Sequence, residues 1–173
     1  MSKKIRIYLY LSAILYSALA TYPTTAYDHF FYYPDFKSNY TWLTPEIYLA
    51  ATYWSKYYHV PISDILAIIH HESEGNPYAR SYTNARGLMQ VMPYHWSGDI
   101  NQLYDINLNI QLGTRYYRWC LDYCKNDKSC AIRCYNAGPY YPQSNYKNYN
   151  YLYGILNKSK GTAPILSKPI LVY

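Results

Sequence analysis

The segment spanning residues 61–77, with the sequence PISDILAIIHHESEGNP, contains the strongest candidate for a catalytic side chain. A helix turns by about 100° per residue, which places Glu72 on the same arc as Ile65, Ile68 and Ile69. A carboxyl group on a core-facing stripe loses solvation, which raises its pKa, and the negative end of the helix dipole disfavours ionisation further. An acid that keeps its proton near neutral pH is suited to general acid catalysis, so Glu72 is the candidate catalytic residue.

The helix that would position Glu72 has recognisable ends. Pro61 is compatible with a first turn, Ser63 or Asp64 can cap it, and Gly75 followed by Asn-Pro is typical of a helix end. The side opposite the apolar stripe contains Ala67, His70 and Glu74, and it is expected to be the polar side of the helix.

The pair His71-Glu72 also begins like a His-Glu-x-x-His zinc helix. The position of the second histidine is Gly75, so the second ligand is missing and no metal is expected. The chain has no Gly-rich phosphate loop and no Gly-x-Ser-x-Gly elbow, and Ser73 has no evident base partner. No cofactor is expected.

Three short blocks in a fixed order are jointly specific, although each alone is weak. They are Glu-Ser at 72–73, Gly-Leu-Met-Gln at 87–90 and Tyr-Asn-Ala-Gly at 135–138. Further matching residues accompany them: Asn76-Pro77, Ala79, Ser81, Met92-Pro93, Asn109-Ile110, Gly113 and Pro139. Over residues 44–156 the chain resembles the soluble lytic transglycosylase family, which is related to goose-type lysozymes.

The resemblance implies an all-α, compact, lysozyme-like domain that cleaves peptidoglycan glycan strands. Ordinary glycosidases use two carboxylates, whereas here a single acid is expected to act with help from the substrate. Glu72 would protonate the glycosidic oxygen between N-acetylmuramic acid and N-acetylglucosamine, while the muramyl N-acetyl group stabilises the positive centre. Glu72 would then take the proton of the C6 hydroxyl, which closes a 1,6-anhydro ring without water or cofactor.

The resemblance also implies which residues bind the substrate. Six are expected to line the cleft: Ser73, Ser81, Met89, Gln90, Tyr135 and Asn136. Tyr135 is expected to hydrogen-bond near Glu72 and to help set its protonation, whereas Met89 could equally fill the core. Small members of this kind resemble enzymes that open the cell wall for secretion or conjugation machines, so a secretion-system complex is a candidate partner by analogy.

Two other functions stay open at this point. A goose-type lysozyme uses the same fold and acid but hydrolyses the bond with water, which Asp99 or Asp105 could position. A catalytically idle wall-binding protein could keep the cleft, although the presence of Glu72, Gln90 and Tyr135 argues against it.

Residues 1–20 have the composition of a secretory signal, with a basic start, an apolar run at 7–15 and Ala18-Leu19-Ala20 at the end. Cleavage is expected after Ala20, or alternatively after Ala26, and an uncleaved N-terminal anchor stays possible. The mature protein is therefore expected to be periplasmic or secreted, without a membrane segment.

Composition excludes one class of partner. The 173 residues are enough for one domain, and the formal charge is +6, of which Lys3, Lys4 and Arg6 contribute half. The remaining bias is compatible with an anionic wall polymer but too weak to indicate nucleic acid. Tyrosine, with 27 residues against 3 Phe, is interpreted mainly as compositional bias, with a functional role for a few rings.

The rest of the chain is expected to form one helical domain at 44–157, preceded by an irregular arm at 21–43 and followed by an extended tail at 158–173. Helices are predicted at 44–58, 107–124, 129–135 and 149–157, and a short helical piece is predicted from Gly87. Thr44 and Ser129 are the expected caps. In the polar loop at 76–86, Asn84 stands where the family usually has Gly, and Asn tolerates a positive φ.

Four cysteines follow the spacing Cys-x3-Cys-x5-Cys-x3-Cys, so each pair lies on one helix face. Because the turn between the two helices is short, the favoured pairing is Cys120–Cys134 with Cys124–Cys130. Crossed pairing and pairing within one helix are geometrically poorer, and a four-Cys zinc site is the rival. A signal peptide implies an oxidising compartment, which favours disulfides.

Overall fold

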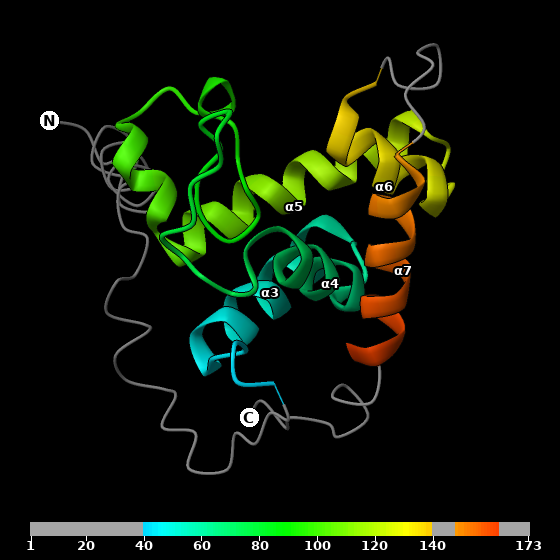
Figure 1. Ribbon diagram of the computed structural model, residues 1–173, viewed down its shortest axis with the longest axis horizontal. Helices are drawn as coiled ribbons and strands as arrows, with labels where there is room; N and C mark the ends of the chain where they lie inside the picture. The colour runs from blue at the N-terminus through cyan, green and yellow to red at the C-terminus, as the bar shows by residue number, and fades with distance from the viewer. Residues whose placement is uncertain (1–39, 140–147, 163–173) are drawn as a thin grey trace, which may run out of the picture. The chain divides into compact units, whose positions relative to one another are not determined.

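The structure, a computed structural model, describes residues 40–139 and 148–162. This part is helical, with α3 (Pro45–Tyr58), α4 (Ile62–Ser73), η1 (Pro93–His95), η2 (Ile100–Tyr104), α5 (Ile106–Tyr123), α6 (Lys128–Ala137) and α7 (Tyr149–Thr162) (Figure 1). Among these residues, β pairing is limited to two isolated bridges within 80–91. The all-α prediction is confirmed. The predicted signal segment at 1–20 and most of the predicted arm at 21–43 lie outside the described residues.

Helix α4 is the central element, because α3 packs on one part of its surface and α7 on another (Figure 1). Every residue from Asp64 to Ile69 is buried. The prediction of a polar side that includes Ala67 is therefore wrong in the middle of the helix, where the residues are buried on every side. The two ends of the helix are partly exposed, at Ile62 and Ser63 and again from His70 onward.

Helix ends agree with the sequence prediction at α3 and differ at α4. The Thr44 hydroxyl accepts the Ile47 N–H at 3.3 Å, as expected for an N-cap. Helix α4 has no side-chain cap, since its N-cap residue is Pro61, and the Asp64 carboxylate lies in the interior. There it pairs with the Lys128 amine at 2.6 Å and accepts the Tyr117 hydroxyl at 3.2 Å. The predicted capping role of Ser63 or Asp64 is thus wrong.

Two other element predictions are corrected. Helix α6 is capped by Asp127, whose carboxylate accepts the Cys130 N–H at 2.8 Å, and not by Ser129. Helix α7 continues to Thr162, so residues 158–162 are helical and not part of an extended tail. The additional turn of α7 contributes to packing, because its residue Ser159 is buried.

The segment from Gly87 to Gln90 forms a turn, where a short helix was predicted. Gly87 has φ 73° and Gln90 has φ 50°, which no right-handed helix contains. Asn84, as predicted, adopts a positive φ of 74°. The turn is fixed from inside by Asn109 of α5, which accepts the Met89 N–H at 2.8 Å and donates to the Arg86 and Leu103 carbonyls.

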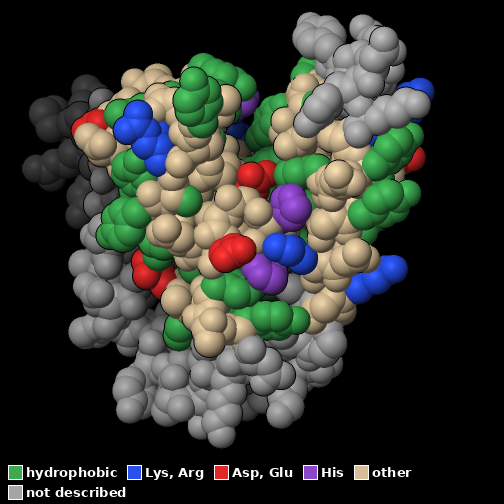
Figure 2. Space-filling view, in the orientation of Figure 1, with side chains coloured by type: hydrophobic (Ala, Val, Ile, Leu, Met, Phe, Trp, Pro, Cys, Tyr) green, Lys and Arg blue, Asp and Glu red, His purple; other side chains and the backbone are tan. Residues whose placement is uncertain are grey.

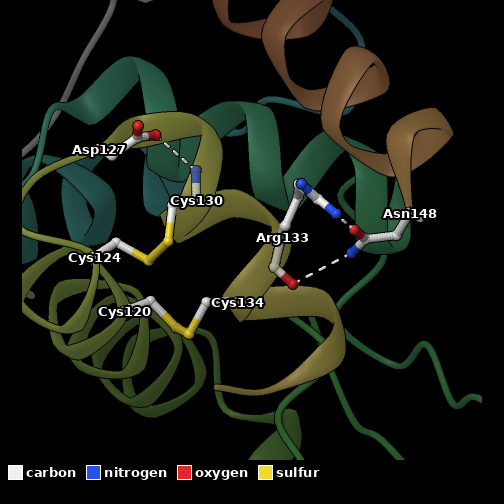
Figure 3. The surroundings of a disulfide bond; sticks show 7 residues. All are labelled: Cys120, Cys124, Asp127, Cys130, Arg133, Cys134 and Asn148. Carbon is white, nitrogen blue, oxygen red and sulfur yellow. Dashed lines mark hydrogen bonds between the residues drawn. A yellow bond between two sulfur atoms is a disulfide. The ribbon is translucent and has the colours of Figure 1, made fainter. Parts of the chain in front are cut away.

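Both predicted disulfides, Cys120–Cys134 and Cys124–Cys130, are present between α5 and α6. Figure 3 shows them side by side, next to the Asp127 cap of α6. Helix α6 is also tied to the start of α7, because Asn148 accepts from Arg133 Nε at 2.9 Å and donates to its carbonyl (Figure 3). The two disulfides thus fix the hairpin of α5 and α6, which ends in the Tyr-Asn-Ala-Gly block.

Reduction of these bonds is expected to lower the free energy of unfolding. Closing a loop of the size spanned by Cys120 and Cys134, separated by 14 residues, is worth about 3 kcal/mol. Urea unfolding with and without reductant would measure the change. A variant with all four cysteines replaced by serine is the control and should not respond to reductant. Free thiols with bound zinc in the oxidised protein would contradict the assignment.

Candidate active site

Glu72 lies in the last turn of α4 and lines a cavity of about 440 Å³. The other lining residues come from the loop after α4, from α5 and from the end of α6: Ser81, Thr83, Ala85, Gln90, Val91, Met92, Tyr94, His95, Leu112, Gly113, Tyr116, Tyr135, Asn136, Ala137 and Gly138. All three sequence blocks therefore contribute to one cavity, as the resemblance implied.

The cavity gives Glu72 the electrostatics of a general acid. Burial raises the pKa of Glu72 to about 6, and a hydrogen bond from the Tyr151 hydroxyl opposes part of that rise. The carboxyl group is therefore partly protonated just below neutral pH, in agreement with the expectation from the apolar stripe. Glu74 is exposed at the left-handed C-cap of the helix and does not line the cavity.

The tyrosine that contacts Glu72 is Tyr151 of α7, a residue that the sequence did not single out. Tyr151 also meets the His71 ring edge to face, with ring centroids 4.8 Å apart. Gly154 allows this approach, because a Cβ there would come within 2.6 Å of the His71 ring. One glycine in α7 thus brings the helix close enough to α4 for Tyr151 to reach Glu72.

Tyr135 differs from its expected role. Its hydroxyl donates to the Met89 carbonyl at 2.7 Å, while Tyr151 supplies the direct hydrogen bond to Glu72. Tyr135 still lines the same cavity as Glu72, and burial, followed by the charge of Glu72, raises the pKa of its phenol well above the usual value. In the free protein Tyr135 therefore fixes the 87–90 turn and forms a wall of the cavity.

Two of the six predicted cleft residues do not line the cavity. The Ser73 hydroxyl lies 2.8 Å from the Leu88 carbonyl and 3.2 Å from the Ile69 carbonyl, so it ties the 87–90 turn to the end of α4. Met89 is fully buried. Of the two roles considered for Met89, core filling is the one that the structure supports.

The other predicted cleft residues do reach the cavity, and each is held in place. The Gln90 amide nitrogen donates to the Gly87 carbonyl at 2.9 Å. The Asn136 amide oxygen accepts from Asn148 at 3.0 Å. The Ser81 hydroxyl accepts the Ala85 N–H at 2.9 Å. These contacts orient the side chains before any ligand arrives.

Among the described residues that line this cavity, Glu72 is the one carboxylate. Asp99 and Asp105, the residues considered for positioning water, both serve as caps. The Asp99 carboxylate accepts the Asn101 N–H at 2.9 Å, and the Asp105 carboxylate accepts the Leu108 N–H at 2.7 Å. A second carboxylate is thus absent from the described cavity wall.

A patch of histidine, acidic and basic side chains gathers above the end of α4 on the face shown in Figure 2. In this region the Lys158 amine of α7 lies 3.2 Å from the His70 carbonyl. Burial, and then the charge of Lys158, lower the pKa of both His70 and His71, which favours the neutral form of both rings. Within residues 40–139 and 148–162, no group of three metal-ligating side chains is found.

Similar proteins were found among curated sequences. The chain is 44% identical over 64 residues to the membrane-bound lytic murein transglycosylase E of Buchnera aphidicola subsp. Acyrthosiphon pisum, which covers 30% of this chain and 29% of that protein. It is 33% identical over 91 residues to the soluble lytic murein transglycosylase of Escherichia coli K12, covering 46% and 14%. The chain thus spans less than a third of the length of either relative.

Solved structures show the same fold. The 70 kDa soluble lytic transglycosylase of Escherichia coli superimposes with a TM-score of 0.50 at 27% identity, over 65% of this chain and 18% of the other. The family model described as "Transglycosylase SLT domain" matches residues 50–155, which is more than half of the sequence. The chain therefore belongs to the transglycosylase SLT domain family.

Proposed function

We propose that this protein is a lytic transglycosylase that cleaves the β-1,4 bond between N-acetylmuramic acid and N-acetylglucosamine in peptidoglycan. The observation that carries the proposal is the single acid on the described wall of the cavity. Glu72 has a pKa raised to about 6 and stands in a cavity whose other described lining residues include no carboxylate. Family membership and the lytic murein transglycosylases among its relatives support the same reaction.

The first step is protonation of the leaving oxygen. Glu72 in its acid form donates its proton to the glycosidic oxygen as the bond to C1 of the muramyl sugar breaks. A second enzyme carboxylate would ordinarily stabilise C1 or activate water. With no second carboxylate on the described cavity wall, the neighbouring N-acetyl oxygen of the substrate takes that role and stabilises the positive centre.

The second step uses the same residue as a base. The Glu72 carboxylate removes the proton of the C6 hydroxyl, and C6 oxygen attacks C1 to form the 1,6-anhydro ring, which displaces the N-acetyl oxygen. Tyr151 is suited to this step, because its hydrogen bond favours the ionised carboxylate. The Glu72 proton is restored at the end of the cycle, so no water is consumed.

The location that suits this function is outside the cytoplasm. The predicted signal at 1–20 and the two disulfides support export to an oxidising compartment, the periplasm or the exterior. In the described residues no helix is long and apolar enough to cross a bilayer. Service to a secretion or conjugation machine is a further part of the proposal and rests on analogy with small enzymes of this kind.

The pH dependence of the activity should report the pKa of Glu72 and the effect of its hydrogen bond with Tyr151. Activity requires the protonated acid, so kcat/KM should be high below pH 6 and fall as pH rises through the pKa of about 6. Tyr151→Phe removes the hydrogen bond that lowers this pKa, so the falling limb should move to higher pH. Tyr153→Phe, two residues along on the exposed side of α7, is the matched control and should leave the limb in place. If Tyr151→Phe leaves the falling limb of the pH profile where it was, the hydrogen bond from Tyr151 does not set the pKa of Glu72.

Mass spectrometry of the released muropeptides tests the proposed reaction. Purified peptidoglycan digested by the mature protein should yield 1,6-anhydro ends, which are lighter than hydrolysed ends by one water. Reducing ends without anhydro sugars would make the protein a lysozyme. Absence of any release, with Glu72 intact, would favour a wall-binding protein.

A further inference from the structure

A second cavity, of about 630 Å³, adjoins the candidate active site. The two cavities share five lining residues: Tyr94, His95, Leu112, Tyr116 and Gly138. Arg115 and Trp119, both on α5, line only the second one. A hollow therefore leads from Glu72 past Tyr116 and onto the outer surface of α5.

Three aromatic rings continue this path along α5. Tyr116 and Trp119 have ring centroids 5.7 Å apart and planes inclined by 12°, and Trp119 and Tyr123 have centroids 5.6 Å apart and planes inclined by 24°. Steps of three and four residues keep them on one helix face. Trp119 is 45% exposed and Tyr123 is 48% exposed. We call these three residues the aromatic track.

We propose that the aromatic track binds the sugar rings of a glycan strand beyond those that flank Glu72. This inference rests on the proposed function and adds an extended binding site to it. A polymeric substrate that enters the first cavity must leave it, and the shared wall at Tyr116 leads to the track. Pyranose rings present flat C–H faces that stack on aromatic rings, and the phenol of Tyr123 can also hydrogen-bond sugar hydroxyls.

A positive charge beside the aromatic track and the rigidity of this end of α5 both support a glycan strand as the ligand. Arg115 is an exposed cation on the wall of the second cavity, suited to the lactyl or peptide carboxylates that muramyl sugars carry. Cys120 and Cys124 lie next to Trp119 and Tyr123 in the chain and tie this end of α5 to α6. The track is thus held in place before binding, which lowers the entropy lost on association.

Exposure alone would not justify the proposal, because this chain is rich in tyrosine. Tyr53 and Tyr57 of α3 are also exposed, at 55% and 62%, and their rings are stacked with centroids 6.4 Å apart. They line neither of the two cavities. The pair is therefore a matched control, with similar rings and similar exposure but no connection to Glu72.

The test measures binding by the Glu72→Gln protein, which cannot consume the ligand. Glycan strands from peptidoglycan are separated into a tetrasaccharide pool and a pool of longer strands, and calorimetry gives Kd for each. Longer strands should bind more tightly than tetrasaccharides. Combining Trp119→Ala with Tyr123→Ala should weaken binding of the longer strands by about tenfold. This change would remove the gain in affinity with strand length. Tyr53→Ala with Tyr57→Ala should retain the gain, and Trp119→Tyr, which keeps a flat ring, should retain part of it.

The outcomes separate this proposal from the proposed function. If the gain with length persists in the Trp119→Ala and Tyr123→Ala protein, or is lost equally in the Tyr53 and Tyr57 control, the track does not bind glycan. If the Glu72→Gln protein binds neither pool while its circular dichroism matches that of the parent, peptidoglycan is not the ligand and the proposed function itself fails.

Discussion

Glu72→Gln should lower the rate of glycan cleavage by between about 10²- and 10⁴-fold, the range that one general acid supplies. The amide keeps the shape of the side chain and can still accept from Tyr151, but it has no acidic proton to donate. Since the carboxyl group loses solvation by burial, its replacement by a neutral amide should not destabilise the fold.

Glu74→Gln is the matched control, two residues away on the same segment. Glu74 is exposed, stands at the C-cap of α4 and does not line the cavity. Release of soluble muropeptides from purified wall, at equal concentrations of folded protein, gives both rates. Comparable losses in the two variants would contradict the assignment of Glu72 as the acid.

The setting of Glu72 could be predicted from sequence, because it is a local property of one helix. The 3.6-residue period places Glu72 with Ile65, Ile68 and Ile69, and these three are fully buried in the structure. The same period failed for the opposite side of the helix, since Ala67 is equally buried. The number of elements that pack around a central helix decides which of its faces are buried. The hydrophobic pattern of that one helix does not reveal this number.

The hydrogen-bond partner of Glu72 could not be predicted, because the contact joins two residues on different helices, Glu72 and Tyr151, that are 79 residues apart in the chain. A helix beginning at Tyr149 was expected, but nothing local distinguishes Tyr151 from the other 26 tyrosines. Its position depends on the contact between Gly154 and His71. The disulfides, in contrast, followed from helical spacing and a short turn, both of which are local.

The motif residues illustrate a different limit. Ser73, Met89 and Gln90 belong to blocks that resemble the family equally well, yet only Gln90 lines the cavity. Ser73 and Met89 act instead on the shape of the turn that carries Gln90. A motif shows that residues are needed together, and it does not separate those that face a ligand from those that hold the backbone.

Asn109→Ala, on α5, is expected to be the most destabilising single substitution among the side chains that hold the 87–90 turn. Asn109 is fully buried, and its amide satisfies three backbone groups: the Met89 N–H at 2.8 Å, the Arg86 carbonyl at 2.8 Å and the Leu103 carbonyl at 2.7 Å. Each buried polar group left without a partner costs about 1–3 kcal/mol, so the free energy of unfolding should fall by at least about 3 kcal/mol. Urea unfolding followed by circular dichroism measures it.

The control is Asn101→Ala, whose side chain is exposed on η2 and which should change stability by no more than about 0.5 kcal/mol. Limited proteolysis then separates a local effect from a global one. Because Asn109 holds the turn at 86–89, its loss should expose that turn to cleavage under conditions where the helices remain folded, and glycan cleavage should fall with it. Asn109→Asp should be no better than alanine, since it keeps the acceptor for Met89 but sets an oxygen against two carbonyl oxygens. A stability change as small as that of the Asn101 variant would show that the turn is held by other contacts.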